Sequence, residues 1–316
     1  MLHLLIGTDW TRNRDAILAR LADDVHTRRE GRILMVPELI SHETERALCR
    51  FAGDTASRYA EVLSFTRLAR RAAEQAGSSA MECLDSGGRV VAMAAAARQL
   101  ASKLKAYAAV ETKPEFLTEL IDAVDEFKRC CITAQDLKVA AAQTEGSLAQ
   151  KLEELSLLME SYDALCSQGK RDPRDQMTWL LEQLEESDYA QTHVFYIDGF
   201  PDYTRQHLEI LEHLIQFSPS VTVSLNCDSI GSRQLAFEKA GQTASEIYRA
   251  AQRLNIPVQV ELIPGREDAL SPMRERLFQG AIQIGSCAGC LDTAQADSPW
   301  AEVMAAAHRV RELVQS

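Results

Sequence analysis

The feature that most constrains the fold is a repeated alternation between short β-branched runs and stretches with helical spacing. Runs of the first kind occupy Leu2–Gly7, Arg32–Pro37 and Ala60–Phe65. Each is followed by apolar residues spaced as on one face of a helix, which after the first run is predicted over Asp15–Val25. Strand–helix repetition of this kind predicts an α/β fold with a parallel, doubly wound sheet.

A long interval without strand patterns interrupts this alternation. Between about Gly77 and Ser187 the apolar residues follow helical spacing only, which predicts an all-helical insertion. The helices predicted within it are Val90–Leu104, Glu115–Cys131, Thr133–Ala142, Ser147–Ser167 and Arg174–Glu186.

The alternation resumes at His193. Strands are predicted at Val194–Ile197, Val221–Leu225 and Val258–Leu262, with helices Thr204–Phe217 and Thr243–Leu254 between them. The remaining candidates are a helix at Leu270–Phe278, a strand at Ala281–Ile284 and a terminal helix at Ala301–Val314.

Composition narrows the functional class. The chain is 46% hydrophobic and 25% charged, as in ordinary globular proteins. Its net charge of −12 argues against a broadly basic nucleic-acid coat, but not against a local basic channel. There is no signal-peptide pattern, no membrane-span pattern, and the eight cysteines are scattered. We therefore expect a cytoplasmic protein with reduced thiols and no membrane partner.

The segment Val194–Gln206 carries the strongest functional signal. A β-branched and aromatic run ends at Asp198, and a polar turn then leads into a helix. In open α/β sheets, ligands bind beyond the carboxyl ends of the strands. A strand-end acidic residue positions Mg²⁺ in P-loop NTPases, so the segment raises the question of a nucleotide site.

At this point the chain resembles a known family. Phe195–Gln206 is similar to the second helicase motif of the UvrD/RecB superfamily. Asp198–Phe200, Val36–Glu38, Val62–Ala69 and Glu126–Cys130 are similar to blocks of the AddB (RexB) subunit of AddAB-type ATP-dependent helicase–deoxyribonucleases. The resemblance covers nearly the whole chain in family order, but only the amino-terminal part of that longer protein.

The resemblance implies a RecA-like, P-loop NTPase-type helicase domain 1A in residues 1–76 and 188–275. Residues 77–187 would be the inserted helical subdomain 1B, and residues 276–316 a linker with the incomplete start of a second RecA-like domain. The family's nuclease domain and iron–sulfur cysteines would lie downstream. The implied partners are an AddA-type motor subunit and single-stranded DNA, in double-strand-break repair by homologous recombination.

The expected position of a phosphate loop follows the first strand. Family members that keep the motif have Gly-x-x-Gly-x-Gly-Lys-Ser/Thr there. Gly7 is retained, Trp10 and Arg12 replace the other glycines, Asn13 replaces the Lys, and Arg14 replaces the hydroxyl residue. Because glycines and Lys are needed for close approach to phosphates, we expect no working ATP site.

The second half of the nucleotide site is also altered. Asp198 matches the Mg²⁺-positioning acid, but Gly199 replaces the catalytic Glu. Asp198 is either a strand-end cap or a vestigial metal ligand. Gln206 matches a family glutamine near nucleotide and DNA, or is a polar residue in a first helical turn. We expect no catalytic residue, no bound metal and no cofactor in this region.

Candidate DNA contacts follow the second and third strands. They are Ser41, His42, Ser64, Phe65, Thr66, Arg67, Arg70 and Arg71. Hydroxyls and arginines contact phosphates, and an aromatic ring stacks on a base. The alternatives are helix capping for the hydroxyls, a core position for Phe65 and a solvated basic helix face for the arginines.

Two further interpretations remain open. One is a nucleotide-binding switch with an altered phosphate loop, and the other is a structural module that only docks the motor subunit. Cys287 and Cys290 form a lone CxxC pair. Structural zinc needs four ligands, and no second pair has matching spacing, so loop thiols are expected.

Overall fold

The computed structural model describes residues 1–77, 82–108, 113–271, 273 and 294–315. The chain divides into two compact units, Met1–Gly265 and Arg266–Ser316. The second contains α13 (Pro299–Gln315), which matches the predicted terminal helix. Most of the predicted helix Leu270–Phe278, the predicted strand Ala281–Ile284 and both CxxC cysteines lie outside the described residues.

A six-stranded sheet forms the centre of the first unit, with the order β3-β2-β4-β5-β1-β6. Its strands are β1 (Leu2–Gly7), β2 (Arg32–Met35), β3 (Ala60–Leu63), β4 (Val194–Ile197), β5 (Val221–Asn226) and β6 (Val258–Leu262). All pairings are parallel. This confirms the predicted α/β fold, and every strand ends at the same edge of the sheet.

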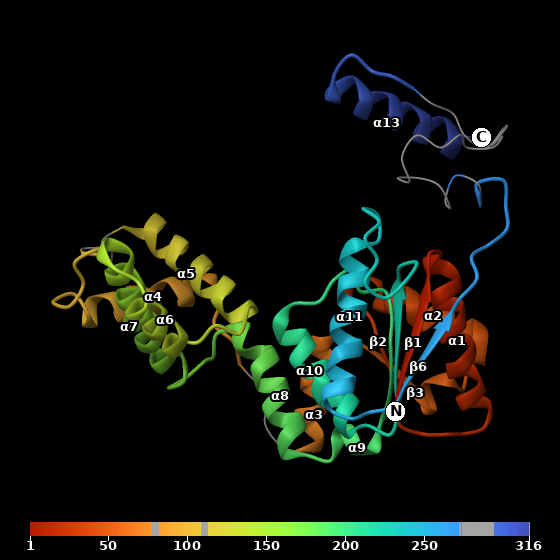
Figure 1. Cartoon of the computed structure of the whole chain (residues 1–316), viewed down its shortest axis with the longest axis horizontal. Coiled ribbons are helices and arrows are strands. Elements are labelled where there is room, and N and C mark those ends of the chain that lie inside the picture. The colour runs from red at the N-terminus through yellow and green to blue at the C-terminus, as the bar shows by residue number, and fades with distance from the viewer. Residues whose placement is uncertain (78–81, 109–112, 272, 274–293, 316) are drawn as a thin grey trace. The chain divides into compact units, whose positions relative to one another are not determined.

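Helices cover both faces of this sheet (Figure 1). One face is packed against α1 (Trp10–His26) and α2 (Ser41–Ala52). The other is packed against α3 (Phe65–Gln75), α8 (Gln176–Glu186), α9 (Tyr189–Thr192), α10 (Arg205–Phe217) and α11 (Glu238–Arg253). Side chains alternate along each strand, so Leu5 lies in the first core and Leu4 and Ile6 in the second.

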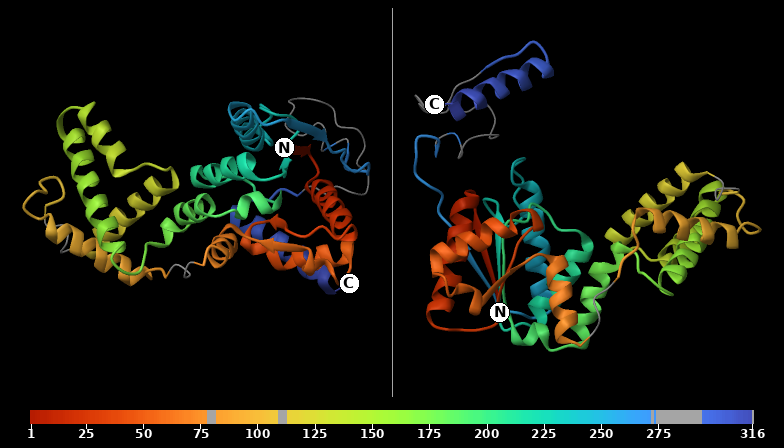
Figure 2. Two further views of the ribbon diagram at one scale, coloured as in Figure 1. Left: turned by 90° about the horizontal axis from the view of Figure 1, so that it is seen from below. Right: turned by 180° about the vertical axis from the view of Figure 1, so that it is seen from behind.

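The helical insertion has a core of its own (Figure 2). It comprises α4 (Ser86–Gln99), α5 (Pro114–Arg129), α6 (Ala134–Ala142) and α7 (Gly146–Cys166). Thr133 and Asp136 form a reciprocal capping box at the start of α6. Among the described residues of this region, the only β contact is an isolated bridge between Cys83 and Arg171.

Helix α8 belongs to the sheet by its packing. Its helical spacing alone placed it in the insertion, within residues 77–187. However, Trp179, Leu180 and Leu184 lie in the core between α3, α10 and the sheet. A short 3₁₀ turn, η4 (Pro173–Asp175), links the insertion to α8. In the described part of the chain, no helix is both long and apolar enough to cross a bilayer.

Helix α1 starts earlier than its apolar spacing predicted. The sequence suggested a start near Asp15, whereas the helix begins at Trp10. Asp9 caps it, because its Oδ1 accepts hydrogen bonds from the backbone N–H groups of Thr11 (3.1 Å) and Arg12 (3.4 Å). Only Thr8 and Asp9 therefore separate β1 from α1.

Candidate nucleotide and nucleic-acid site

The carboxyl edge of the sheet brings the two predicted sites close in the fold. Gly7 ends β1, Asp198 follows β4, and Ser41 and Ser64 open the helices after β2 and β3. Because the strands are parallel, these positions lie along one edge. The ends of β1 and β4, the start of α1 and the start of the loop that follows β5 are together called the nucleotide corner.

The amino terminus of α1 is occupied by a protein carboxylate. Free N–H groups and the helix dipole make such a terminus an anion site, and P-loop proteins place phosphate there. Here the carboxylate of Asp9, which is only 6% exposed, accepts hydrogen bonds from two of those N–H groups. The segment is helical from Trp10 onward, so α1 occupies the position of a phosphate loop.

Asn13, at the position of the motif's Lys, is directed into the protein. Its Nδ2 donates to the carbonyl oxygens of Gly7 (3.0 Å) and Leu225 (3.2 Å), which ties the end of β1 to β5. A Cβ on Gly7 would lie 2.3 Å from Asn13 Oδ1 and 2.8 Å from the carbonyl oxygen of Ile263. Gly7 is thus required by the packing of Asn13, independently of any phosphate.

Arg14 is held by α2. Its guanidinium lies 3.4 Å from both the carboxylate of Glu43 and the hydroxyl of Thr44. Its side chain is only 12% exposed. The positive charge of Arg14 also reaches Asp198, where it favours the ionised carboxylate.

Asp198 is buried at the end of β4 and is 6% exposed. It accepts a hydrogen bond from Ser224 Oγ of β5, and its backbone N–H donates to Met35 of β2 at 3.0 Å. Burial raises the pKa of Asp198 above its ordinary value; the Ser224 bond, the Arg14 charge and the Gly199 N–H oppose that rise.

Gly199 has a backbone that disfavours the catalytic Glu it replaces. Its φ is +77°, in the left-handed region, and a Cβ there would lie 2.8 Å from Ile40 Cδ1. Together with Asp9 and Asn13, this geometry does not fit Mg²⁺–ATP bound in the P-loop manner, because the described residues of the corner offer no phosphate loop, no Lys and no carboxylate next to Asp198 at position 199.

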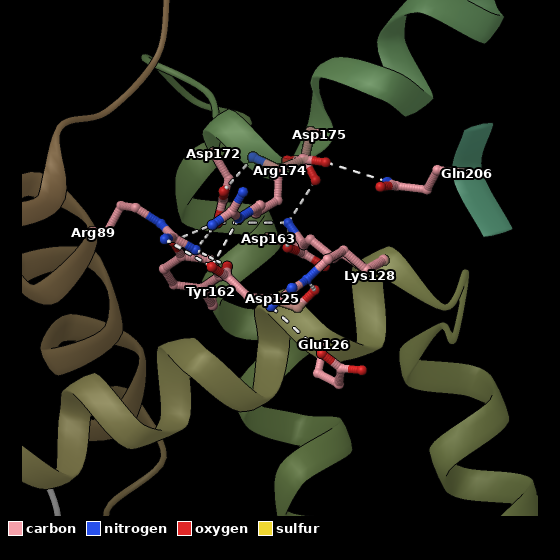
Figure 3. A network of polar contacts seen from close by, with 11 residues as sticks. Arg89, Asp125, Glu126, Lys128, Tyr162, Asp163, Asp172, Arg174, Asp175 and Gln206 are labelled. Atoms are coloured by element: carbon pink, nitrogen blue, oxygen red, sulfur yellow. Dashed lines mark hydrogen bonds and ion pairs between the residues drawn. The ribbon is translucent and has the colours of Figure 1, made fainter. Parts of the chain in front are cut away.

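Gln206 lies away from the nucleotide corner. Its Nε2 donates to the carbonyl oxygen of Arg174 (3.3 Å) and to Thr178 Oγ1 (3.5 Å). Arg174 lies in η4, at the base of the helical insertion (Figure 3), and Thr178 lies in the first turn of α8. A second bond joins the insertion to α10: the Cys131 thiol donates to Glu209 of α10 at 3.2 Å.

A group of charged side chains, buried at its centre and exposed at Arg174, lies at that base, and no sequence pattern predicted it. Its members, called the insertion network, are Arg89, Asp125, Lys128, Tyr162, Asp163, Asp172, Arg174 and Asp175 (Figure 3). They join α4, α5 and α7 to η4. The one sequence signal nearby was the Asp172-Pro173 break before the predicted helix.

Asp172 is the centre of the insertion network. It is fully buried and accepts from Tyr162 (2.6 Å), from Arg89 (3.1 Å) and from the backbone N–H of Arg174 (2.8 Å). Lys128 lies 2.6 Å from Asp175 and 2.8 Å from Asp163. Burial lowers the pKa of Lys128, but these carboxylates outweigh it and raise the pKa overall.

The predicted DNA residues after β3 divide into buried and exposed ones. Ser64 caps α3 by accepting from the Arg67 N–H at 3.3 Å, and its hydroxyl donates to Glu38. Phe65 is buried and stacks on His207, with 4.3 Å between ring centroids. Thr66 is exposed at the start of α3.

Two of the three predicted arginines have acidic partners. Arg67 lies 3.1 Å from Glu45, and Arg71 lies 2.9 Å from Glu61. Arg70 is exposed and makes no ion pair with any residue that the structure describes.

The two predicted DNA contacts after β2 also differ in exposure. Ser41 is buried and donates to the carbonyl oxygen of Glu38 at 2.9 Å. His42 is exposed, 3.8 Å from Glu45. Of the predicted DNA contacts, the exposed residues without a strong acidic partner are therefore His42, Thr66 and Arg70.

Comparison with known proteins agrees with the resemblance seen in the sequence. A family model described as "ADDB, N-terminal" matches residues 4–274. Proteins named as the B subunit of an ATP-dependent helicase/deoxyribonuclease are similar to the chain. One from a Thermoanaerobacter species is 33% identical over 199 residues, which is 62% of this chain and 17% of that protein.

Two other proteins of that name match longer segments. The one from Clostridium tetani is 28% identical over 269 residues (80% of this chain, 23% of that protein). The one from Bacillus velezensis is 25% identical over 277 residues (83% and 24%). The chain thus spans about a quarter or less of the length of these relatives.

Proposed function

The chain belongs to the family of AddB amino-terminal regions, and from this premise we propose that it is a helicase-like domain that contacts single-stranded DNA without turning over ATP. The observation that carries the proposal is the Asp9 carboxylate at the amino terminus of α1. An anion already bonded to those N–H groups leaves no site there for a nucleotide phosphate.

The rest of the nucleotide corner supports the same proposal. Asn13 is bonded to two backbone carbonyls, and the left-handed backbone at Gly199 disfavours a second carboxylate. Asp198 remains, but a single buried carboxyl with a raised pKa is a poor Mg²⁺ ligand and leaves the attacking water without a base.

Calorimetry on the full-length AddB-type protein tests the absence of nucleotide binding. Titration with Mg²⁺–ATP into the millimolar range is expected to give no binding heat, and the protein alone is expected to have no ATPase activity. An ATPase activity that disappears in Asp198→Ala would overturn the proposal, because it would show that the corner still holds a working metal ligand.

The DNA-facing part of the proposal concerns His42, Thr66 and Arg70. His42 and Thr66 lie in the first turns of α2 and α3, at the carboxyl edge of the sheet, and Arg70 lies in the middle of α3; all three are exposed. A guanidinium and a hydroxyl there provide phosphate contacts without base recognition. We therefore expect weak, salt-sensitive binding of single strands rather than sequence-specific binding.

Fluorescence anisotropy with a labelled oligothymidine at low salt tests that contact. Arg70→Glu is expected to weaken binding about tenfold and to reduce the log–log salt slope by about one unit. Arg50→Glu is the matched control, since Arg50 is exposed in the last turn of α2, at the opposite edge of the sheet. Equal loss in the two variants would contradict a contact at the carboxyl edge.

The relatives are named as subunits, which indicates a protein that works within a complex. We propose an AddA-type motor subunit as the partner and double-strand-break repair as the process. In such a complex the partner hydrolyses ATP, and this domain supplies a fixed surface along which a single strand passes.

A further inference from the structure

Strand β3 forms one edge of the sheet, and β2 is the one strand of the described residues that pairs with it. In that ladder the N–H groups of Arg32 and Val36 donate to the carbonyl oxygens of Tyr59 (3.1 Å) and Leu63 (2.9 Å). Backbone groups alternate sides along a strand, so the N–H and C=O of Ala60 and Val62 point away from β2. Among the described residues, no backbone hydrogen bond outside the ladder involves either of them.

A groove of about 310 Å³ runs along this open edge. All four residues of β3 line it, with α2 on one wall and α3 on the other. Leu48 and Val62 also line it but are only 3% and 4% exposed, and the exposed Cys49 of α2 lies at its side. The groove therefore combines an unpaired main chain with apolar contacts, as do sites that bind a peptide by strand addition.

The charges on the walls favour polypeptide over nucleic acid. Arg67 and Arg71 line the groove, but Glu45 and Glu61 neutralise them at 3.1 Å and 2.9 Å. Carboxylates beside each arginine repel a phosphodiester backbone. The outward N–H and C=O groups of Ala60 and Val62, by contrast, match the main chain of an extended peptide.

We propose that the β3 edge groove binds an extended segment of the partner subunit, which adds to the sheet as a further strand. This rests on the proposed role as one subunit of a helicase–deoxyribonuclease. It also assigns Arg67 and Arg71, which the sequence associated with DNA, to a protein interface. Arg70 lies on the same helix but does not line the groove.

Hydrogen exchange tests the proposal in the full-length protein, alone and in complex with its AddA-type partner. The Val62 N–H faces the open edge, so its exchange is expected to slow at least about tenfold in the complex. A complex that forms with unchanged exchange at Val62 would overturn the inference but leave the proposed role within a complex standing. Failure of the two proteins to associate would overturn both.

A pair of variants separates main-chain bonding from packing. Val62→Pro removes the outward N–H without removing a bond to β2, because proline fits an edge strand whose N–H points away from its neighbour. Val62→Ala shortens the same side chain and keeps that N–H. We expect about tenfold weaker association for the proline variant and about twofold at most for the alanine variant. Equal weakening, with native circular dichroism in both, would contradict strand addition.

Thiol labelling gives a third measurement on the unaltered protein. Cys49 lines the groove, whereas Cys130, also exposed, ends α5 in the insertion. Complex formation is expected to slow maleimide labelling of Cys49 and leave Cys130 unchanged. Labelling of Cys49 at the same rate in the free and bound protein would overturn the assignment of the partner to this groove.

Discussion

The nucleotide corner and the insertion network both bury polar side chains, but the bonds that these side chains make differ in kind. In the corner, Asn13 bonds to two backbone carbonyls and Asp198 to a serine hydroxyl. In the network, Arg89, Lys128 and Arg174 bond to buried or half-buried carboxylates. The corner is held mainly by local hydrogen bonds, and the network by charge.

This difference shows two ways in which one fold holds buried polar side chains in place. In the corner, the bonds of Asn13 and Asp198 link neighbouring strands at the edge of the sheet. In the network, charged side chains attach the insertion to η4, and Gln206 of α10 bonds to the carbonyl oxygen of Arg174 in η4. Three predictions test this contrast, and the largest effect is expected in the network.

Asp172→Ala should be strongly destabilising. The substitution leaves the Tyr162 hydroxyl without its buried acceptor and removes one of the two carboxylates that bond Arg89, the other being Asp125. Breaking such a buried network by removing one partner costs about 3–5 kcal/mol. Urea denaturation of the chain measures the change. Lys138→Ala is the control, because its ion pair with Glu160 is exposed and is worth about 0–1 kcal/mol. Similar losses in both variants would show that the network contributes no more than a surface pair.

Asn13→Ala should have an intermediate effect. It removes two buried hydrogen bonds, to the carbonyl oxygens of Gly7 and Leu225, at a cost of about 1–3 kcal/mol in unfolding free energy. Arg12→Ala, one residue away and exposed, should change stability by about 0.5 kcal/mol or less. Asn13→Lys, which recreates the motif residue, should destabilise the chain without restoring ATP binding; a variant that binds ATP would contradict the structural role.

The sequence predicted those features of the two regions that depend on the spacing of apolar residues along one element. Apolar spacing located all six strands and most helices, because each element must bury one face. It misplaced the start of α1, because the cap depends on the Asp9 side chain and not on apolar spacing. It also missed the insertion network, since Arg89 and Asp172 meet only after α4, α5 and α7 have packed together. No spacing rule relates such distant positions.

The sequence also could not predict the environment of individual side chains. The sequence left open whether Phe65 lies in the core or stacks on a base, and the structure buries it against His207. Likewise Gln206 occupies a motif position, but its partners, Arg174 and Thr178, come from the connection that follows the insertion. A family motif fixes the residue type, whereas the packing of the inserted helices decides what that residue contacts.

The smallest effect on stability is expected from a change of pH. Here Asp198 in the corner and Asp125 in the network should respond with opposite sign. Burial raises the folded-state pKa of Asp198, so the native state binds this proton more tightly than the unfolded state does. Its contribution to stability is then fully present below the ordinary value of 3.8 and is lost as pH rises through the folded pKa. For Asp125 the bonds from Arg89 and Arg174 outweigh burial and lower the pKa, so its contribution is lost as pH falls.

Asp198→Asn should therefore gain stability relative to the unaltered chain as pH rises from about 4, by about 1 kcal/mol for each unit of pKa shift. Asp125→Asn should lose stability relative to it over the acidic range. Unfolding free energies of the three proteins at a series of pH values measure both differences, and other titrating groups cancel in each. If Asp198→Asn instead lost stability with rising pH, Arg14 and Ser224 would outweigh burial. The corner would then hold an ionised carboxylate by charge, as the network does, and the contrast between the two regions would fail.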